Sequence, residues 1–203
     1  MENKFIVFSG KKQAGKTTAA RHIADLLGDA QITSFASPIK EFCINILDIK
    51  EEQIYGTDEE KNSPTMYRWE NLPLAIKTRY NKKEFKGGPM TAREVMQVFG
   101  TDIMRESFDL DIWAKAPFRK KYDTKWVIID DCRFPNEAVM SLEYGACLVR
   151  LDRCRPSEDN HPSEVALDKF DQWSHLIKGD ICIDELKHLV TVALIEKGLV
   201  SGT

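Results

Sequence analysis

The chain has 203 residues, the length of one domain or of one domain that carries insertions. Hydrophobic residues make up 42% of it, which is enough for a core and excludes wholesale disorder. The 29 lysines and arginines nearly balance the 32 aspartates and glutamates, whereas proteins that bind DNA or anionic membranes usually carry a basic excess. We therefore expect neither a nucleic-acid partner nor a membrane partner.

The apolar runs and the cysteines predict a cytoplasmic protein. No apolar run is long enough to cross a bilayer, and the first ten residues, MENKFIVFSG, contain no signal-peptide core. The five cysteines are scattered without a C-x-x-C pair, so the sequence predicts neither a disulfide framework nor a zinc cluster.

The first half of the chain alternates strand and helix and then becomes irregular. Hydrophobic spacing predicts a strand at 5–8, a helix at 16–27 that ends at Gly28, a strand at 31–35 and a helix that begins at Pro38. The segment 50–89 is charged, rich in turn residues and poorly periodic. We interpret it as a surface insertion with short helices around 69–80.

Regular structure is expected again from Thr91, which forms a capping box with Glu94 at the start of a helix. The pattern then predicts a strand at 125–130, a helix at 135–144, a strand at 147–151, a loop to 164, a short strand near 181–183 and a final helix. Strands separated by helices indicate an α/β fold with a parallel sheet.

Residues 10–17, GKKQAGKT, match the phosphate-loop pattern G-x-x-x-x-G-K-[ST] after a buried strand and before a helix. The glycines let the backbone approach a phosphate, and the amides at the helix N-terminus attract the anion. Lys16 would bridge the outer phosphates and Thr17 would hold Mg²⁺; the alternative is a glycine turn beside a surface lysine. The residues expected at the donor site are Gly10, Lys11, Gln13, Ala14, Gly15, Lys16, Thr17, Thr18 and Arg150.

Two aspartates and an arginine follow the apolar strand W-V-I-I. A carboxylate at the carboxyl end of a parallel strand lies where ligands bind, so Asp131 is expected to orient Mg²⁺, while Asp130 either shares that role or caps the next turn. Arg133 is placed to hold a phosphate with both guanidinium nitrogens, unless it is a plain surface arginine.

A second group of arginines, in R-L-D-R-C-R-P, leads into a loop at about 152–164. Phosphoryl transfer needs charge neutralisation, so Arg153 and Arg155 are expected to close over the phosphates as a mobile lid. The alternative is a solvated run of charges. The expected catalytic set is Lys16, Asp131, Arg133, Arg153 and Arg155.

Several further blocks occur along the chain in a fixed order. They are F-A-S-P-I-K (35–40), T-A-R-E-V-M-Q-V-F-G-T-D-I-M-R (91–105) with I-W (112–113), D-D-C-R-F-P-N-E-A (130–138), and H-P-S-E (161–164). Together with the phosphate loop they resemble the bacteriophage-type deoxynucleoside monophosphate kinases over nearly the whole chain. The blocks at 97–102 and 131–137 are the most specific.

The resemblance implies a three-layer nucleoside-monophosphate-kinase-like fold, with a five-stranded parallel sheet, an inserted helical region and a lid. It places a single kinase domain with its core at 1–49 and 125–203 and its acceptor-binding region at about 50–124. It also implies that the γ-phosphate of ATP passes, with Mg²⁺, to a deoxynucleoside monophosphate for DNA precursor synthesis, in the host cytoplasm if the protein is phage-encoded.

The resemblance also assigns acceptor-side residues. Asp131 and Arg133 would face the acceptor phosphate, and Arg93, Gln97 and Arg105 would lie on the helix that forms the wall of the acceptor site. Lys40, just inside the start of an earlier helix, is expected near the acceptor phosphate, and Thr101 is expected to bind the acceptor as well. Four-residue spacing independently puts Arg93, Gln97 and Thr101 on one helix face, although the last two could equally face solvent. Two departures from the family pattern are Ser37 in place of an aspartate, and Lys178-Gly179 where an asparagine is common.

Other functions fit the phosphate loop alone. A small-molecule kinase of the dephospho-coenzyme A or shikimate type would leave the long insertion unexplained, and an ATPase or nucleotide-dependent binding module would suit the aspartate pair.

The resemblance to the phage kinases also suggests a homodimer. The apolar side chains of the insertion would form either that dimer surface or local packing; they are Tyr67, Trp69, Leu72 and Leu74.

Overall fold

The computed structural model of the chain describes residues 3–77, 87–153 and 165–200. The chain folds into two compact units: a core unit, Met1–Phe35 with Ala114–Thr203, and an inserted unit, Ala36–Trp113. The boundaries differ from the expected 49/50 and 124/125. The inserted unit starts earlier because Cys43, on the helix after Pro38, is buried with residues of that unit.

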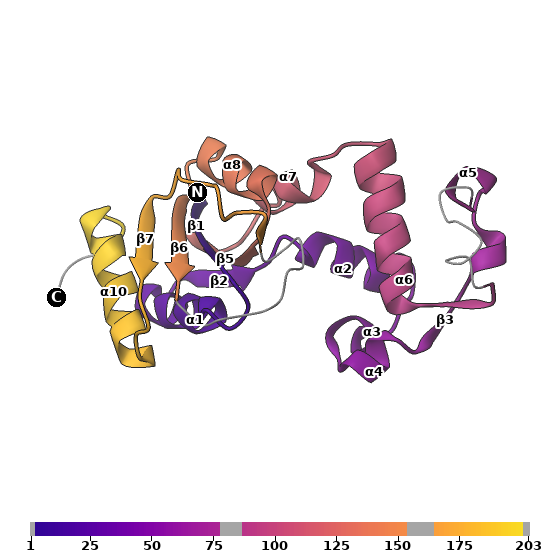
Figure 1. Cartoon of the computed structure of the whole chain (residues 1–203), viewed down its shortest axis with the longest axis horizontal. Helices are drawn as coiled ribbons and strands as arrows, with labels where there is room; N and C mark the ends of the chain where they lie inside the picture. The colour runs from indigo at the N-terminus through magenta and orange to yellow at the C-terminus, as the bar shows by residue number, and fades with distance from the viewer. Residues whose placement is uncertain (1–2, 78–86, 154–164, 201–203) are drawn as a thin grey trace. The chain divides into compact units, whose positions relative to one another are not determined.

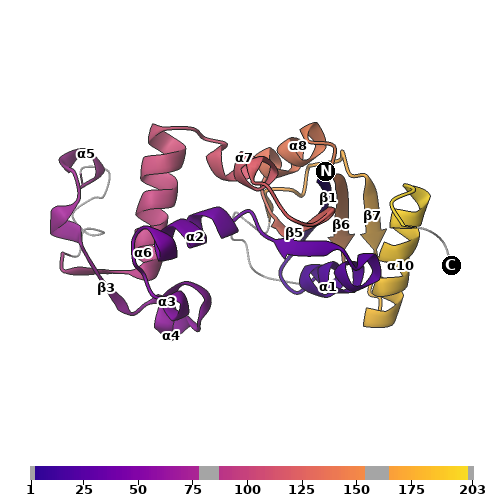
Figure 2. The ribbon, with the colours of Figure 1, turned by 180° about the vertical axis from the view of Figure 1, so that it is seen from behind.

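The core unit contains a five-stranded parallel sheet, which confirms the predicted fold class. Its strands are β1 (Lys4–Gly10), β2 (Ala30–Thr33), β5 (Trp126–Cys132), β6 (Cys147–Asp152) and β7 (His175–Lys178), in the order β2-β5-β1-β6-β7. Helices α1 (Lys16–Leu27) and α10 (Ile183–Glu196) lie side by side on one face of the sheet, and α8 (Pro135–Glu143) lies on the other (Figures 1 and 2).

Alternation along β1 divides the core into two layers. Ile6 and Phe8 are fully buried in the layer that contains α1 and α10, whereas Val7 is buried in the layer that contains α8. This is the pattern of a strand covered on both faces, since successive side chains point to opposite sides. The phosphate-loop segment leaves the carboxyl end of this central strand.

The prediction of a strand near 181–183 is wrong. The last strand is β7, in which Ile177 is buried while Leu176 and Lys178 are exposed, as at the edge of a sheet. Ile181 instead packs against the core from a loop, and Ile183 already begins α10. A four-residue strand with one buried side chain is too short to give a clear alternation, which is why the neighbouring apolar run was more conspicuous.

The inserted unit is built from short elements around its own core. These are α2 (Ser37–Asn45), α3 (Glu51–Tyr55), α4 (Asp58–Lys61), β3 (Pro64–Arg68), η1 (Trp69–Asn71), α5 (Leu74–Lys77), β4 (Pro89–Thr91), α6 (Ala92–Gln97) and the π-helix η2 (Val98–Arg105); α7 (Ile112–Arg119) begins in this unit. Strands β3 and β4 pair antiparallel.

Most of the apolar side chains that could have formed a dimer surface are used inside this unit. Trp69 is buried in its core, and Leu72 packs against the same cluster. The Tyr67 hydroxyl donates to the carbonyl of Leu47, whereas Leu74 is exposed. Local packing therefore accounts for most of the apolar side chains that a dimer surface could also have explained.

The capping box at Thr91 is confirmed, but the helix that follows changes its geometry. The Thr91 hydroxyl accepts from the amide of Glu94 at 3.2 Å, and the Glu94 carboxylate accepts from the amide of Thr91 at 2.9 Å. From Val98 the helix is a π-helix, whose wider turn does not stack side chains at four-residue intervals. Arg93 and Gln97 are both exposed, while Thr101 lies in the widened part.

In the part of the chain that the structure describes, no helix is long and apolar enough to cross a membrane.

Candidate active site

The phosphate loop folds into a cradle that only glycine permits at two positions. Gly15 has φ +96°, and a Cβ atom there would lie 2.7 Å from the buried side chain of Leu186. A Cβ atom on Gly10 would lie 2.7 Å from the carbonyl oxygen of Leu151. Because a side chain tolerates neither approach, both positions require glycine for the loop to keep this path, in which backbone amides can surround an anion.

Lys16 lies folded into this cradle. Its ammonium donates to the carbonyls of Gly10, at 2.6 Å, and Lys11, at 2.9 Å, and the residue is 9% exposed. Helix α1 begins at Lys16 with no described side chain capping its first amides and no acidic residue in its first turn. The first amides of a helix have no partner within that helix, so together with the buried Lys16 ammonium the start of α1 attracts an anion.

The aspartate pair at the end of β5 is divided between the two faces of the sheet. Asp130 accepts a hydrogen bond from the Thr17 hydroxyl at 2.8 Å, whereas Asp131 accepts from the backbone amide of Phe35 at 2.6 Å. The register between β1 and β5 shifts at this point, from Val7 opposite Ile129 to Ser9 opposite Cys132. Such an irregularity in strand pairing changes where side chains point, and here the carboxylate beside Thr17 belongs to Asp130.

Two of the three arginines of the expected catalytic set lie among the described residues of the core unit. Arg153 donates to the carbonyls of Ala14, at 3.5 Å, and Ile181, so it lies against the phosphate loop. Arg133 follows β5, and its backbone amide donates to the Glu137 carboxylate at 2.7 Å. Arg155 and most of the expected lid at 152–164 lie outside the described residues.

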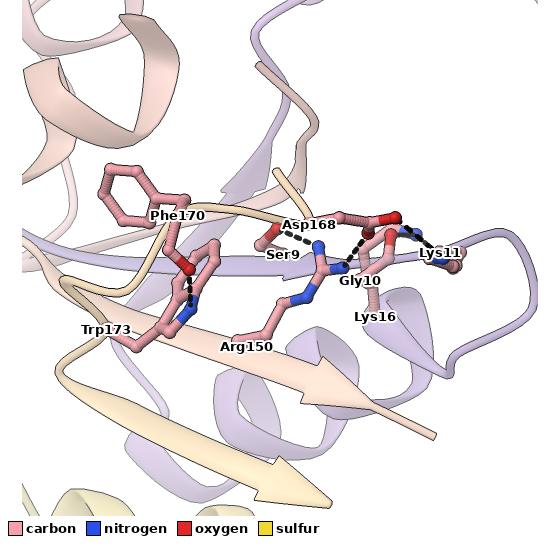
Figure 3. A network of polar contacts seen from close by, with 8 residues as sticks. All are labelled: Ser9, Gly10, Lys11, Lys16, Arg150, Asp168, Phe170 and Trp173. Carbon is pink, nitrogen blue, oxygen red and sulfur yellow. Dashed lines mark hydrogen bonds and ion pairs between the residues drawn. The ribbon is translucent and has the colours of Figure 1, made fainter. Parts of the chain in front are cut away.

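Arg150 is buried at the end of β6 rather than open to solvent. Its guanidinium donates to the Ser9 hydroxyl at 3.0 Å, lies 3.7 Å from the Asp168 carboxylate and stacks over the ring of Trp173 at 5.4 Å (Figure 3). Asp168 also pairs with Lys11 at 3.3 Å. Arg150 was expected to bind the donor directly, and Ser9, Asp168 and Trp173 were not expected at the site. Ser9 ends β1 while Asp168 and Trp173 lie between β6 and β7, and no motif links them to Arg150.

Of the expected acceptor-side residues, Asp131 and Arg133 belong to the core unit, and the other five belong to the inserted unit. Lys40 on α2 places its ammonium over the ring of Tyr55 at 4.7 Å, and Arg93 on α6 pairs with Asp58 at 2.8 Å. Gln97 ends α6, and Thr101 and Arg105 lie on the π-helix η2.

Glu137 is a residue of the site that was not expected from the sequence. Its carboxylate accepts from the amides of Arg133 and Phe134 and so anchors the turn after β5. The signal that could have identified Glu137 is its place as the third residue of a helix that begins at Pro135.

Comparison with known proteins identifies the family. A family model described as deoxynucleotide monophosphate kinase matches residues 42–190. The chain is also 32% identical over 191 residues to a putative deoxynucleotide monophosphate kinase of Acanthamoeba polyphaga mimivirus, and the match covers 87% of this chain and 88% of the relative. The chain belongs to the deoxynucleotide monophosphate kinase family. It is a phosphotransferase that acts on deoxynucleoside monophosphates, and the resemblance found from its motifs is confirmed.

The family assignment and the loop geometry are separate observations. The matched range, 42–190, begins after the phosphate loop of this kinase, so the cradle at residues 10–17 is not part of what the family model matches. Membership also favours a deoxynucleoside monophosphate kinase over the ATPase and the small-molecule kinase that the phosphate loop alone would allow.

Proposed function

We propose that this kinase takes the γ-phosphoryl group from ATP, with Mg²⁺, and that the donor binds at the phosphate loop of the core unit. The observation that carries the proposal is the 2.8 Å hydrogen bond from the Thr17 hydroxyl to the Asp130 carboxylate, directly after the loop lysine. In phosphate-loop enzymes a loop Ser or Thr and a carboxylate from a neighbouring strand together hold the metal.

The residues present fit a hard cation and a polyphosphate. A hydroxyl and a carboxylate are oxygen ligands of the kind that Mg²⁺ prefers, and one carboxylate leaves room for water and phosphate oxygens. Bound there, Mg²⁺ would neutralise negative charge on the transferring group. Lys16 would exchange its carbonyl partners for phosphate oxygens, and the backbone amides at the start of α1 would donate to the same phosphate.

The two aspartates then have different roles. Asp130 takes the metal-orienting role that sequence analysis assigned to Asp131. Asp131 fixes the backbone at Phe35, immediately before the inserted unit, and with Arg133 serves the acceptor side of the reaction. Arg93, Gln97 and Thr101 contact the acceptor nucleotide in this proposal, with Lys40 and Arg105, and Arg153 and Arg155 shield the phosphates from water.

The Mg²⁺ dependence of the rate tests the assignment of the aspartates. In Asp130→Asn the neutral amide is a weaker metal ligand, so we expect the Mg²⁺ concentration for half-maximal rate to rise at least tenfold. Asp131→Asn is the matched control, because it removes the same charge one residue away. It should lower kcat while the Mg²⁺ requirement changes less than twofold. The rate is that of nucleoside diphosphate formation from each of the four deoxynucleoside monophosphates with ATP.

Lys16→Ala tests the donor site itself. Loss of this ammonium removes charge stabilisation for which comparable single groups contribute about 3 kcal/mol, so kcat should fall more than a hundredfold in a folded protein. A folded Lys16→Ala variant with near wild-type kcat would contradict the phosphate-loop assignment.

For the aspartates, an equal rise in the Mg²⁺ requirement of Asp130→Asn and Asp131→Asn would contradict the separation of their roles.

A further inference from the structure

The carboxylate of Asp168 joins two cations at the edge of the phosphate loop. One oxygen lies 3.3 Å from the Lys11 ammonium, and the other lies 3.7 Å from the Arg150 guanidinium. Lys11 belongs to the loop and Arg150 to β6, whereas Asp168 comes from the segment between β6 and β7 (Figure 3). One side chain thus neutralises part of the positive charge of the loop.

The Arg150 side of this contact is rigid. Arg150 is 7% exposed, and its guanidinium is also fixed by the buried Ser9 hydroxyl and the face of the Trp173 ring. The Trp173 indole in turn donates to the carbonyl of Phe170 at 2.9 Å. Because Leu167 is buried beside Asp168, the backbone that carries the carboxylate is anchored as well.

The Lys11 side of the contact is open. The Lys11 and Asp168 side chains are 38% and 42% exposed, so the ammonium can leave the carboxylate without disturbing the core. Exposed pairs of this kind contribute little to folding stability. A nucleotide phosphate on the loop would present a denser negative charge to the same ammonium. Asp168 and the phosphate therefore compete for one cation.

We propose that Asp168 is a positioning residue that acts through Lys11, as an internal counter-ion that competes with the nucleotide for the lysine. It draws Lys11 back when the phosphates leave, and so it sets how tightly the donor product is held and how fast it dissociates. The inference rests on the proposed donor site at the phosphate loop. A lysine without this competitor would remain on the phosphates and slow product release.

Binding of Mg·ADP, measured by calorimetry, tests the inference in the full chain. Asp168→Asn keeps the shape of the side chain but removes its charge, and we expect the Kd of ADP to fall about three- to tenfold, together with its dissociation rate. Asp168→Glu restores the charge and should restore a Kd near that of the wild type. Asp171→Asn removes a charge from an exposed position of the same segment and should leave the Kd unchanged.

A double-mutant cycle with Lys11→Met shows whether the effect passes through the lysine. In the Lys11→Met background, Asp168→Asn should change the Kd of ADP less than 1.5-fold. High salt should reduce the single-mutant effect, since both partners are exposed. A fall in melting temperature in Asp168→Asn with an unchanged or weaker affinity for ADP would overturn the inference. A wild-type protein that binds no Mg·ADP would instead contradict the proposed donor site.

Discussion

Single residues show where the backbone of this kinase is under the tightest constraint. Gly15 combines a left-handed φ with a Cβ position 2.7 Å from Leu186 and 3.2 Å from the Arg153 guanidinium. Gly28 also has a positive φ, +72°, but a Cβ atom there would meet nothing within 4 Å. The two glycines therefore separate backbone strain from crowding.

Gly15→Ala should cost about 3 kcal/mol of unfolding free energy and abolish measurable ADP binding. About 1 kcal/mol comes from the left-handed backbone and the rest from overpacking against a buried leucine. Gly28→Ala is the control and should cost about 1 kcal/mol with normal ADP binding, measured by urea unfolding and calorimetry. Equal losses in the two variants would show that crowding at the loop is unimportant.

At the scale of elements, a partly buried histidine joins the two helices on one face of the sheet. His22 on α1 lies 2.9 Å from the Thr191 hydroxyl on α10. Burial, and then the nearby charge of Lys187, lower the pKa of His22 despite the opposing influence of Asp25. Burial, and then Lys197, likewise lower the pKa of His175 on β7.

These lowered pKa values predict loss of stability as pH falls. The unfolded chain takes up a proton at each histidine near pH 6.5, whereas the folded protein resists protonation until a lower pH. The free energy of unfolding should therefore decrease as pH falls below about 6.5 and level off below the folded pKa values. His22→Gln should reduce the difference between pH 7.5 and 5.5 in urea unfolding. The exposed His188→Gln is the control, and an equal effect in both variants would count against the role of His22.

At the scale of the whole molecule, the two units have separate hydrophobic cores. The core unit buries both faces of its sheet, while the inserted unit buries side chains from α2, α3, η1, α5, β4, α6 and η2 in a cluster of its own. We place the donor in the first unit and the acceptor nucleotide largely on the second. A packing defect in one core should therefore affect one substrate more than the other.

Val95→Ala tests this separation, because Val95 is buried in the core of the inserted unit. The cavity should cost about 2 kcal/mol and raise the KM for the deoxynucleoside monophosphate several-fold, while the Kd of ADP stays within twofold of wild type. Val190→Ala creates a similar cavity in the core unit and should leave the KM for the acceptor unchanged. A parallel change of both constants in Val95→Ala would argue against separate substrate sites.

The sequence alone was enough to predict the features whose information is local. The phosphate loop, the capping box of Thr91 and Glu94, and the apolar strand 126–129 each carry their pattern within a few neighbouring residues. Ordered motifs along the chain also led to the correct family, because their spacing in sequence is itself the signal.

Only the tertiary structure decided how distant segments meet. Asp130 and Asp131 are neighbours in sequence where the strand register shifts, and only the packing of α1 shows that Thr17 lies beside Asp130 while Asp131 meets Phe35. Arg150 was expected to meet a phosphate, yet Ser9 of β1 and two residues of the segment between β6 and β7, Asp168 and Trp173, enclose it. Contacts of this kind depend on which faces and strand ends are brought together in space, and no pattern among neighbouring residues encodes that.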